Sequence, residues 1–111
     1  MFWNRSKFAE LDPAQVQSLL HRGDVHLVDV REPHEHAAES IEGAVCMPMS
    51  RFDPKALPQD PRTVVLHCLS GSRSALAASL CLRAGIAVQN MKGGIAAWKA
   101  HGLPTRRRGA A

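Results

Sequence analysis

The chain has 111 residues, 45% of them hydrophobic and 22% charged, which suits one globular domain with its own core. Three charges of the formal net +4 come from Arg106–Arg108, so the rest of the chain carries +1 and gives no reason to expect nucleic-acid binding. The longest apolar run, ALAASLCL, is too short to cross a bilayer, and the first residues lack an apolar signal segment. We therefore expect a cytoplasmic protein that binds neither membranes nor nucleic acids.

The segment LDPAQVQSLLHRG predicts a helix near the start of the chain. Asp12 suits the N-cap, Pro13 the first helical position and Gln15 the third position of a capping box. Apolar residues then recur at helical spacing, and Gly23 is typical of the residue that follows a helix. This helix therefore has a recognisable signal at each end.

Beyond this helix, short apolar runs alternate with helical patterns. The predicted strands are VHLVDV (25–30), GAVCMP (43–48), TVVLHC (63–68) and AVQNM (87–91). The predicted helices are a short one within REPHEHAAES (31–40), one over 50–57, one over 72–84 and one within GGIAAWKAHG (93–102). We expect GAVCMP to be buried, and TVVLHC, which has no polar alternation, to be a central strand. The alternation indicates an α/β fold with a parallel sheet.

In open sheets of this kind, ligands bind beyond the carboxyl ends of the strands. Three segments are expected to meet there: Asp29 and Arg31 at the end of VHLVDV, the loop that begins at Cys68, and Gly93–Gly94. We therefore expect one functional site at that edge of the sheet.

The three cysteines differ in their surroundings. Their odd number and wide spacing predict neither a disulfide framework nor a zinc site. Cys46 and Cys81 lie within a predicted strand and a predicted helix, where a small buried side chain is expected. Cys68 instead ends a strand and precedes a turn with a glycine, three hydroxyls and an arginine, which a packed cysteine does not need. Cys68 is therefore the candidate nucleophile.

The loop HCLSGSRSA (67–75) combines this thiol with the amino end of a helix. Its backbone N–H groups can curl around an anion, and Gly71 permits the close turn. Such surroundings lower a cysteine pKa to roughly 3.5–7.5. Cysteine phosphatases hold phosphate in a longer H-C-x5-R loop, whereas the spacing from Cys68 to Arg73 is C-x4-R. The shorter loop favours a smaller bound group, namely a single sulfur atom carried on Cys68 as a persulfide.

Three segments together resemble the rhodanese, or thiosulfate sulfurtransferase, family, and in particular its small single-domain members. They are LVDVREPHEH, HCLSGSRSA and NMKGGIAAWKAHGLP, in this order and spacing. The resemblance implies a three-layer α/β/α fold, with a five-stranded parallel sheet sandwiched between helices, and a cysteine persulfide mechanism. We place the domain at residues 1–104 and expect 105–111 to be a disordered basic tail. The segment ESIEGA departs from the family's usual G-H-I-P-G-A, which bears on the site entrance and substrate preference.

The resemblance also implies roles for individual residues. Cys68 would accept the sulfur, and Asp29 would support the loop, while Arg31 would either contact substrate or brace the loop by an ion pair or hydrogen bond. The residues expected to bind substrate or cradle the sulfur are Leu69, Ser70, Gly71, Ser72, Arg73 and Arg31, and those expected to support the loop are Ser74, Gly93, Gly94 and Asp29.

Other motif residues are expected to be structural. Trp98 is expected to pack in the core. His34, His36 and His67 share no zinc-ligand spacing, so no metal site is expected. Strand alternation points the His67 side chain away from Cys68, which argues against His67 as the base.

The expected function is sulfur transfer without a cofactor, from a small anionic donor such as thiosulfate to cyanide or a thiol, with a thioredoxin-like protein as one candidate acceptor. Two alternatives remain open: a non-catalytic or regulatory binding module, and a cysteine phosphatase or arsenate reductase. Nothing in the sequence requires an oligomer, so a monomer or weak dimer is expected.

Overall fold

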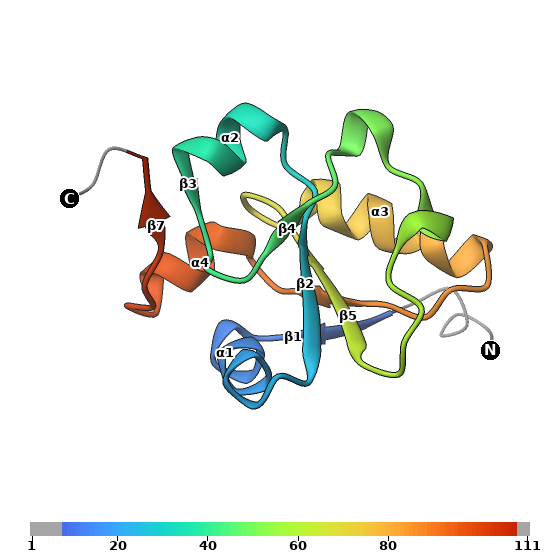
Figure 1. Cartoon of the computed structure of the whole chain (residues 1–111), viewed down its shortest axis with the longest axis horizontal. Coiled ribbons are helices and arrows are strands. Elements are labelled where there is room, and N and C mark those ends of the chain that lie inside the picture. The colour runs from blue at the N-terminus through green and yellow to red at the C-terminus, as the bar shows by residue number, and fades with distance from the viewer. Residues whose placement is uncertain (1–7, 109–111) are drawn as a thin grey trace.

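The computed structural model describes residues 8–108, and a parallel five-stranded sheet lies at its centre (Figure 1). The strand order across the sheet is β1-β6-β5-β2-β4, which makes β5 the central strand. A second, antiparallel sheet contains β3 and β7. The strands are β1 (Ala9–Leu11), β2 (Val25–Asp29), β3 (Glu39–Ser40), β4 (Val45–Cys46), β5 (Thr63–His67), β6 (Gln89–Met91) and β7 (Arg106–Arg107).

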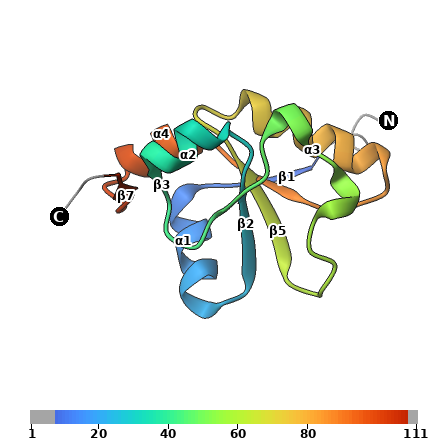
Figure 2. The ribbon, with the colours of Figure 1, turned by 45° about the horizontal axis from the view of Figure 1, so that its top comes forward.

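Helices cover both faces of the parallel sheet, as expected for three layers. Within residues 8–108 the α-helices are α1 (Pro13–Arg22), α2 (Pro33–Ala38), α3 (Ser72–Arg83) and α4 (Gly94–Ala100). Val16 of α1 and Trp98 of α4 pack into one apolar cluster, whereas Ala77 of α3 packs into the other, on the opposite face. Figure 2 shows α2 and α4 at the same end of the sheet, with α3 running away from them.

The first helix has the predicted caps. The Gln15 backbone N–H donates to Asp12 Oδ1 at 2.9 Å, and the Asp12 N–H donates to Gln15 Oε1 at 2.8 Å, which closes the capping box. Gly23 ends the helix with a φ of 71°. The sequence signals at both ends of α1 are confirmed.

The neighbouring strands β2 and β5 bring the segments LVDVREPHEH and HCLSGSRSA together. β2 and β5 pair in parallel from Val25 opposite Thr63 to Asp29 opposite His67. Both strands are almost entirely buried, which accounts for their unbroken apolar character. Cys68 therefore emerges beside Asp29, at the carboxyl end of the sheet.

Two expectations about the fold are wrong, and one strand was missed. The segment 43–48 is not a buried strand, because β4 is a two-residue edge strand in which Val45 is 61% exposed. Residues 50–57 do not form one helix but contribute to two separate 3-10 turns, Met49–Arg51 and Pro54–Ala56. The strand β1 was not predicted at all. It has three residues, of which only Leu11 is partly buried, so its sequence has no periodic pattern of apolar residues.

The expectation of a disordered tail from residue 105 is also wrong for 105–108. Arg106 and Arg107 pair with Ser40 and Glu39 as β7, and the Thr105 hydroxyl donates to a Glu39 carboxylate oxygen. Residues 109–111 lie outside the described part of the chain. Within residues 8–108, no helix has the length and apolar character that a membrane crossing requires.

Candidate active site

Cys68 follows the central strand β5, and its side chain is only 1% exposed. The Gly71 backbone N–H donates to Cys68 Sγ at 3.1 Å. The Ser74 hydroxyl, fully buried in the first turn of α3, lies 3.4 Å from the same sulfur and 3.3 Å from the Gly71 carbonyl oxygen. The sulfur thus sits where the loop turns into the amino end of α3.

These contacts favour the ionised thiol. Burial raises the pKa of Cys68, but hydrogen bonds from the Ser74 hydroxyl and from the amides of Ser74, Gly71 and Arg73 together lower it more. The net pKa of Cys68 therefore lies below the ordinary thiol value. The helix amino end behind the loop acts in the same direction.

The other two cysteines have the opposite electrostatics. Burial raises the pKa of Cys81, in α3, to about 11. Burial also raises the pKa of Cys46, whose thiol donates a long 3.5 Å hydrogen bond to the Arg31 carbonyl. Both thiols stay protonated near neutral pH and are poor nucleophiles.

Gly93 and Gly94 hold the loop from the side of α4. The Ile95 N–H donates to the Cys68 carbonyl at 2.9 Å, and the Ala96 N–H donates to the Leu69 carbonyl at 3.0 Å. A Cβ on Gly94 would lie 2.5 Å from both of these carbonyl oxygens, so only glycine permits the approach. The GG motif therefore packs α4 directly against the cysteine loop.

Gly71 itself needs the freedom of glycine. Its φ is 113°, and a Cβ there would lie 3.5 Å from the Gly93 backbone nitrogen. Around it, Leu69, Ser70 and Ser72 are exposed, so they line the outer surface of the loop. Ser74 is the predicted hydroxyl residue that the structure places against the sulfur.

Asp29 and Arg31 form a buried ion pair beside the loop. Asp29 is fully buried and receives hydrogen bonds from Arg31 Nε at 3.0 Å and Nη2 at 2.8 Å. Arg31 Nη2 also donates to the Glu39 carbonyl at 2.6 Å, and His36 Nδ1 donates to Asp29 at 2.9 Å. Burial raises the pKa of Asp29, but these partners lower it below the ordinary value. In this geometry the Arg31 guanidinium is held by Asp29 and by the Glu39 carbonyl.

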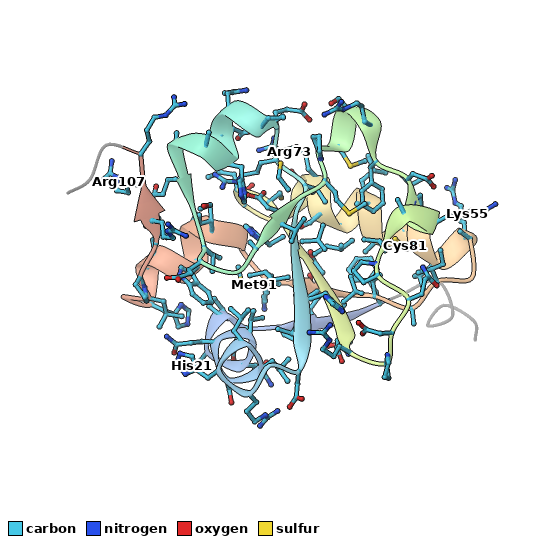
Figure 3. The ribbon with its side chains drawn as sticks, in the orientation of Figure 1. His21, Lys55, Arg73, Cys81, Met91 and Arg107 are labelled. Carbon is cyan, nitrogen blue, oxygen red and sulfur yellow. The ribbon has the colours of Figure 1, made fainter. Side chains whose placement is uncertain are left out.

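Arg73 has a partner that the sequence did not indicate. Its Nη1 and Nη2 donate to the two carboxylate oxygens of Glu35 at 2.7 and 3.0 Å. The Arg73 guanidinium lowers the pKa of Glu35 to about 2. Figure 3 shows Arg73 between α2 and the carboxyl ends of β2 and β5, whereas Cys81 lies farther along α3. The pair joins α2 to the loop.

The histidines do not form a metal centre. Within residues 8–108, no three histidine, cysteine or acidic side chains are grouped so that they could hold a metal ion. His36 instead binds Asp29, and His67 is fully buried with its Nδ1 near the Cys68 carbonyl. The polar groups that contact the Cys68 sulfur are the Gly71 amide and the Ser74 hydroxyl.

Comparison with known proteins places the chain in a family. Residues 12–101 match the family model described as "Rhodanese-like domain". A protein named "Sulfurtransferase" from Allochromatium vinosum is 42% identical over 91 residues, covering 79% of this chain and 84% of that protein. An uncharacterized protein of Synechocystis sp. is 43% identical over 95 residues, but the chain spans only 53% of its length.

A solved structure supports the same fold. The crystal structure of "Thiosulfate sulfurtransferase" from Pseudomonas aeruginosa superposes with a TM-score of 0.82 at 25% identity, covering 90% of this chain and 20% of that one. The expected five-stranded α/β/α architecture is confirmed.

Proposed function

Because the chain belongs to the rhodanese-like domain family, we propose that it is a sulfurtransferase that carries sulfur as a persulfide on Cys68. The proposal rests on the groups that surround the Cys68 sulfur. A buried thiol receives an amide hydrogen bond from Gly71 and lies within reach of the Ser74 hydroxyl, and its pKa is lowered. Cys81 is also buried, but burial raises its pKa to about 11.

In the first half of the proposed cycle, the Cys68 thiolate attacks the outer sulfur of thiosulfate or a similar sulfane donor. A bond forms between the two sulfurs, the donor's S–S bond breaks, and its electron pair leaves with sulfite. The transferred sulfur then carries negative charge at the end of the Cys68 persulfide. We expect the loop amides from Leu69 to Arg73 to stabilise this anion, and the amides of Gly71 and Arg73 already lie near the Cys68 sulfur before the reaction.

In the second half, an acceptor nucleophile attacks the outer sulfur of the persulfide. Cyanide would leave as thiocyanate, and a thiolate would leave as its own persulfide, while the S–S electron pair returns to Cys68. The cycle is covalent and ping-pong, and it needs no metal or organic cofactor. The proposed partners are a small anionic donor and a thiol or cyanide acceptor, including a thioredoxin-like protein, in the cytoplasm.

Two features support sulfur transfer over phosphate hydrolysis. The loop from Cys68 to Arg73 is one residue shorter than the phosphatase pattern, which leaves less room for a phosphoryl group. Arg73 also directs two guanidinium nitrogens at Glu35, so these are not free to bind two oxygens of a phosphate. The proposal therefore assigns Arg73 to holding the loop.

Intact mass spectrometry tests the proposal directly. The protein is mixed with thiosulfate, desalted and weighed, and the expected result is one added sulfur atom that cyanide then removes. The Cys68→Ser variant is the control and should gain nothing. An unmodified parent protein would support a non-catalytic binding module instead, and a phosphorylated cysteine after incubation with an aryl phosphate would support a phosphatase.

A further inference from the structure

His67 is the last residue of β5, directly before Cys68, and it is fully buried. Side chains alternate along a strand: Leu66 and Cys68 pack in the cluster under α3, whereas Val65 packs in the cluster under α1 and α4. His67 shares the face of Val65. Its ring is therefore not placed to take a proton from the Cys68 thiol, and the buried imidazole needs another explanation.

One ring nitrogen contacts the backbone of Cys68. Nδ1 of His67 lies 3.3 Å from the Cys68 carbonyl oxygen. A carbonyl oxygen accepts hydrogen bonds and donates none, so Nδ1 carries the proton and Nε2 the lone pair of a neutral ring. Burial lowers the pKa of His67, which favours that neutral ring. Among residues 8–108, Nε2 has no hydrogen-bond partner, so the ring's only hydrogen bond is the one that Nδ1–H donates to the Cys68 carbonyl.

The same carbonyl is held from a second direction, because the Ile95 N–H donates to it at 2.9 Å. A peptide group is planar, so the direction of the Cys68 C=O fixes the direction of the Leu69 N–H. That N–H is the first of the loop amides. Contacts to the Cys68 carbonyl therefore set the orientation in which the loop begins.

We infer that His67 is a positioning residue, whose Nδ1–H anchors the Cys68 carbonyl and so aims the loop amides at the Cys68 sulfur. This inference rests on the proposed function of Cys68 as the nucleophile. A packing role alone does not explain the residue, because burying an unpartnered ring nitrogen is unfavourable and an apolar side chain would avoid it. Val64, Val65 and Leu66 show that the other buried positions of this strand are apolar.

Three variants of His67 test the inference. His67→Leu keeps an apolar side chain of similar bulk but removes the donor. His67→Asn keeps an N–H close to the position of Nδ1, and His67→Gln places its amide close to Nε2 instead. Two quantities are measured in the full chain: the alkylation rate of Cys68 at pH 7, located by peptide mass spectrometry, and kcat and KM for sulfur transfer.

The leucine variant is expected to alkylate at least about threefold more slowly, because less of its thiol is ionised, and to lose about tenfold in kcat with little change in KM. The asparagine variant should recover most of both quantities and the glutamine variant should not. A leucine variant within twofold of the parent in both, or asparagine and glutamine variants that behave alike, would overturn the inference.

One measurement needs no variant. The ¹⁵N–¹H spectrum of the parent imidazoles should show His67 protonated at Nδ1, and a proton at Nε2 instead would overturn the inference even if a variant failed to fold. The alkylation rate also separates the two proposals. A parent that transfers no sulfur, together with slowed alkylation in His67→Leu, would reject the sulfurtransferase and retain the positioning role.

Discussion

Arg73 and Glu35 lie 38 positions apart in the sequence and form a two-pronged ion pair, at 2.7 and 3.0 Å. Arg73 belongs to the loop that holds Cys68, and Glu35 belongs to the short helix α2. Each side chain is partly buried, so solvent screens the pair less than an exposed one. The loop is thus connected to a second element through a contact that involves no substrate.

Glu35→Gln should lower the rate of sulfur transfer by about tenfold, because a displaced loop no longer aligns its amides with the sulfur. The stability loss should be about 1 kcal/mol or less at neutral pH. The pKa of Glu35 is about 2 in the folded protein against an ordinary 4.5, so the pair's contribution is complete above pH 4.5 and is lost as the pH falls toward 2.

Denaturant unfolding of parent and variant across that pH range checks the prediction. The two stability curves should converge at the acid end. Asp24→Asn, which removes the exposed ion pair with Arg22, is the matched control and should leave sulfur transfer unchanged. Equal loss of activity in both variants would contradict a specific role for Glu35.

Cys68→Ser should abolish thiocyanate formation from thiosulfate and cyanide, by at least about a thousandfold, since the hydroxyl is a far weaker nucleophile than the thiolate. Cys46→Ser and Cys81→Ala are the controls, because both of these thiols have a raised pKa. Activity that survives in Cys68→Ser but disappears in either control would place the reaction at another cysteine.

Ser74→Ala should make the Cys68 thiol less acidic. The Ser74 hydroxyl lowers the pKa of Cys68, so its removal should shift the inflection of alkylation rate against pH upward. The parent should inflect below the pH at which free cysteine does, and sulfur transfer should rise with pH through the same inflection. An identical profile in the variant would mean that the hydroxyl serves the Gly71 carbonyl instead.

Inserting one glycine after Gly71 should convert the loop to the C-x5-R spacing. The amides would no longer converge on the persulfide, and each misplaced hydrogen bond to an anion costs on the order of 1.5–3 kcal/mol, so a tenfold or greater fall in sulfur transfer is expected. Thiosulfate and aryl phosphate are assayed with parent and insertion variant. Efficient phosphate hydrolysis by the parent, or undiminished sulfur transfer by the variant, would contradict the argument from loop length.

Gly94→Ala should displace the loop from α4, because the new Cβ would lie 2.5 Å from the carbonyl oxygens of Cys68 and Leu69. We expect a loss of several kcal/mol in stability, or at least tenfold in activity if the loop moves to relieve the clash. Gly102→Ala is the control: its φ of 74° is also positive, but a Cβ there meets nothing within 4 Å. Similar losses in both variants would show that only the backbone angle matters.

The parts of the fold that were predictable have local signals. The capping box of Asp12 and Gln15, the glycine after α1 and the apolar run of β5 are each readable within a few residues. The sequence signal of the cysteine loop was also local, because Cys68, Gly71 and Ser74 lie within seven consecutive residues and contact one another.

The features that the sequence did not reveal depend on distant partners. Glu35 accepts from the Glu32 N–H at the start of α2, which is a local contact, but its bond to Arg73 arises only when α2 meets the loop. The pairing of Arg107 with Glu39 likewise needs the two chain segments to meet. A three-residue run of basic side chains resembles a solvated tail until the opposite strand is known.

The strand order also constrains when the domain can form during synthesis. β1 leaves the ribosome before the other strands, yet it pairs in parallel with β6, from Ala9 opposite Gln89 to Leu11 opposite Met91. Most of the chain must therefore be translated before this edge of the sheet can close. Until β6 has been made, β1 has no partner strand in this sheet, so an early strand gains its hydrogen bonds late.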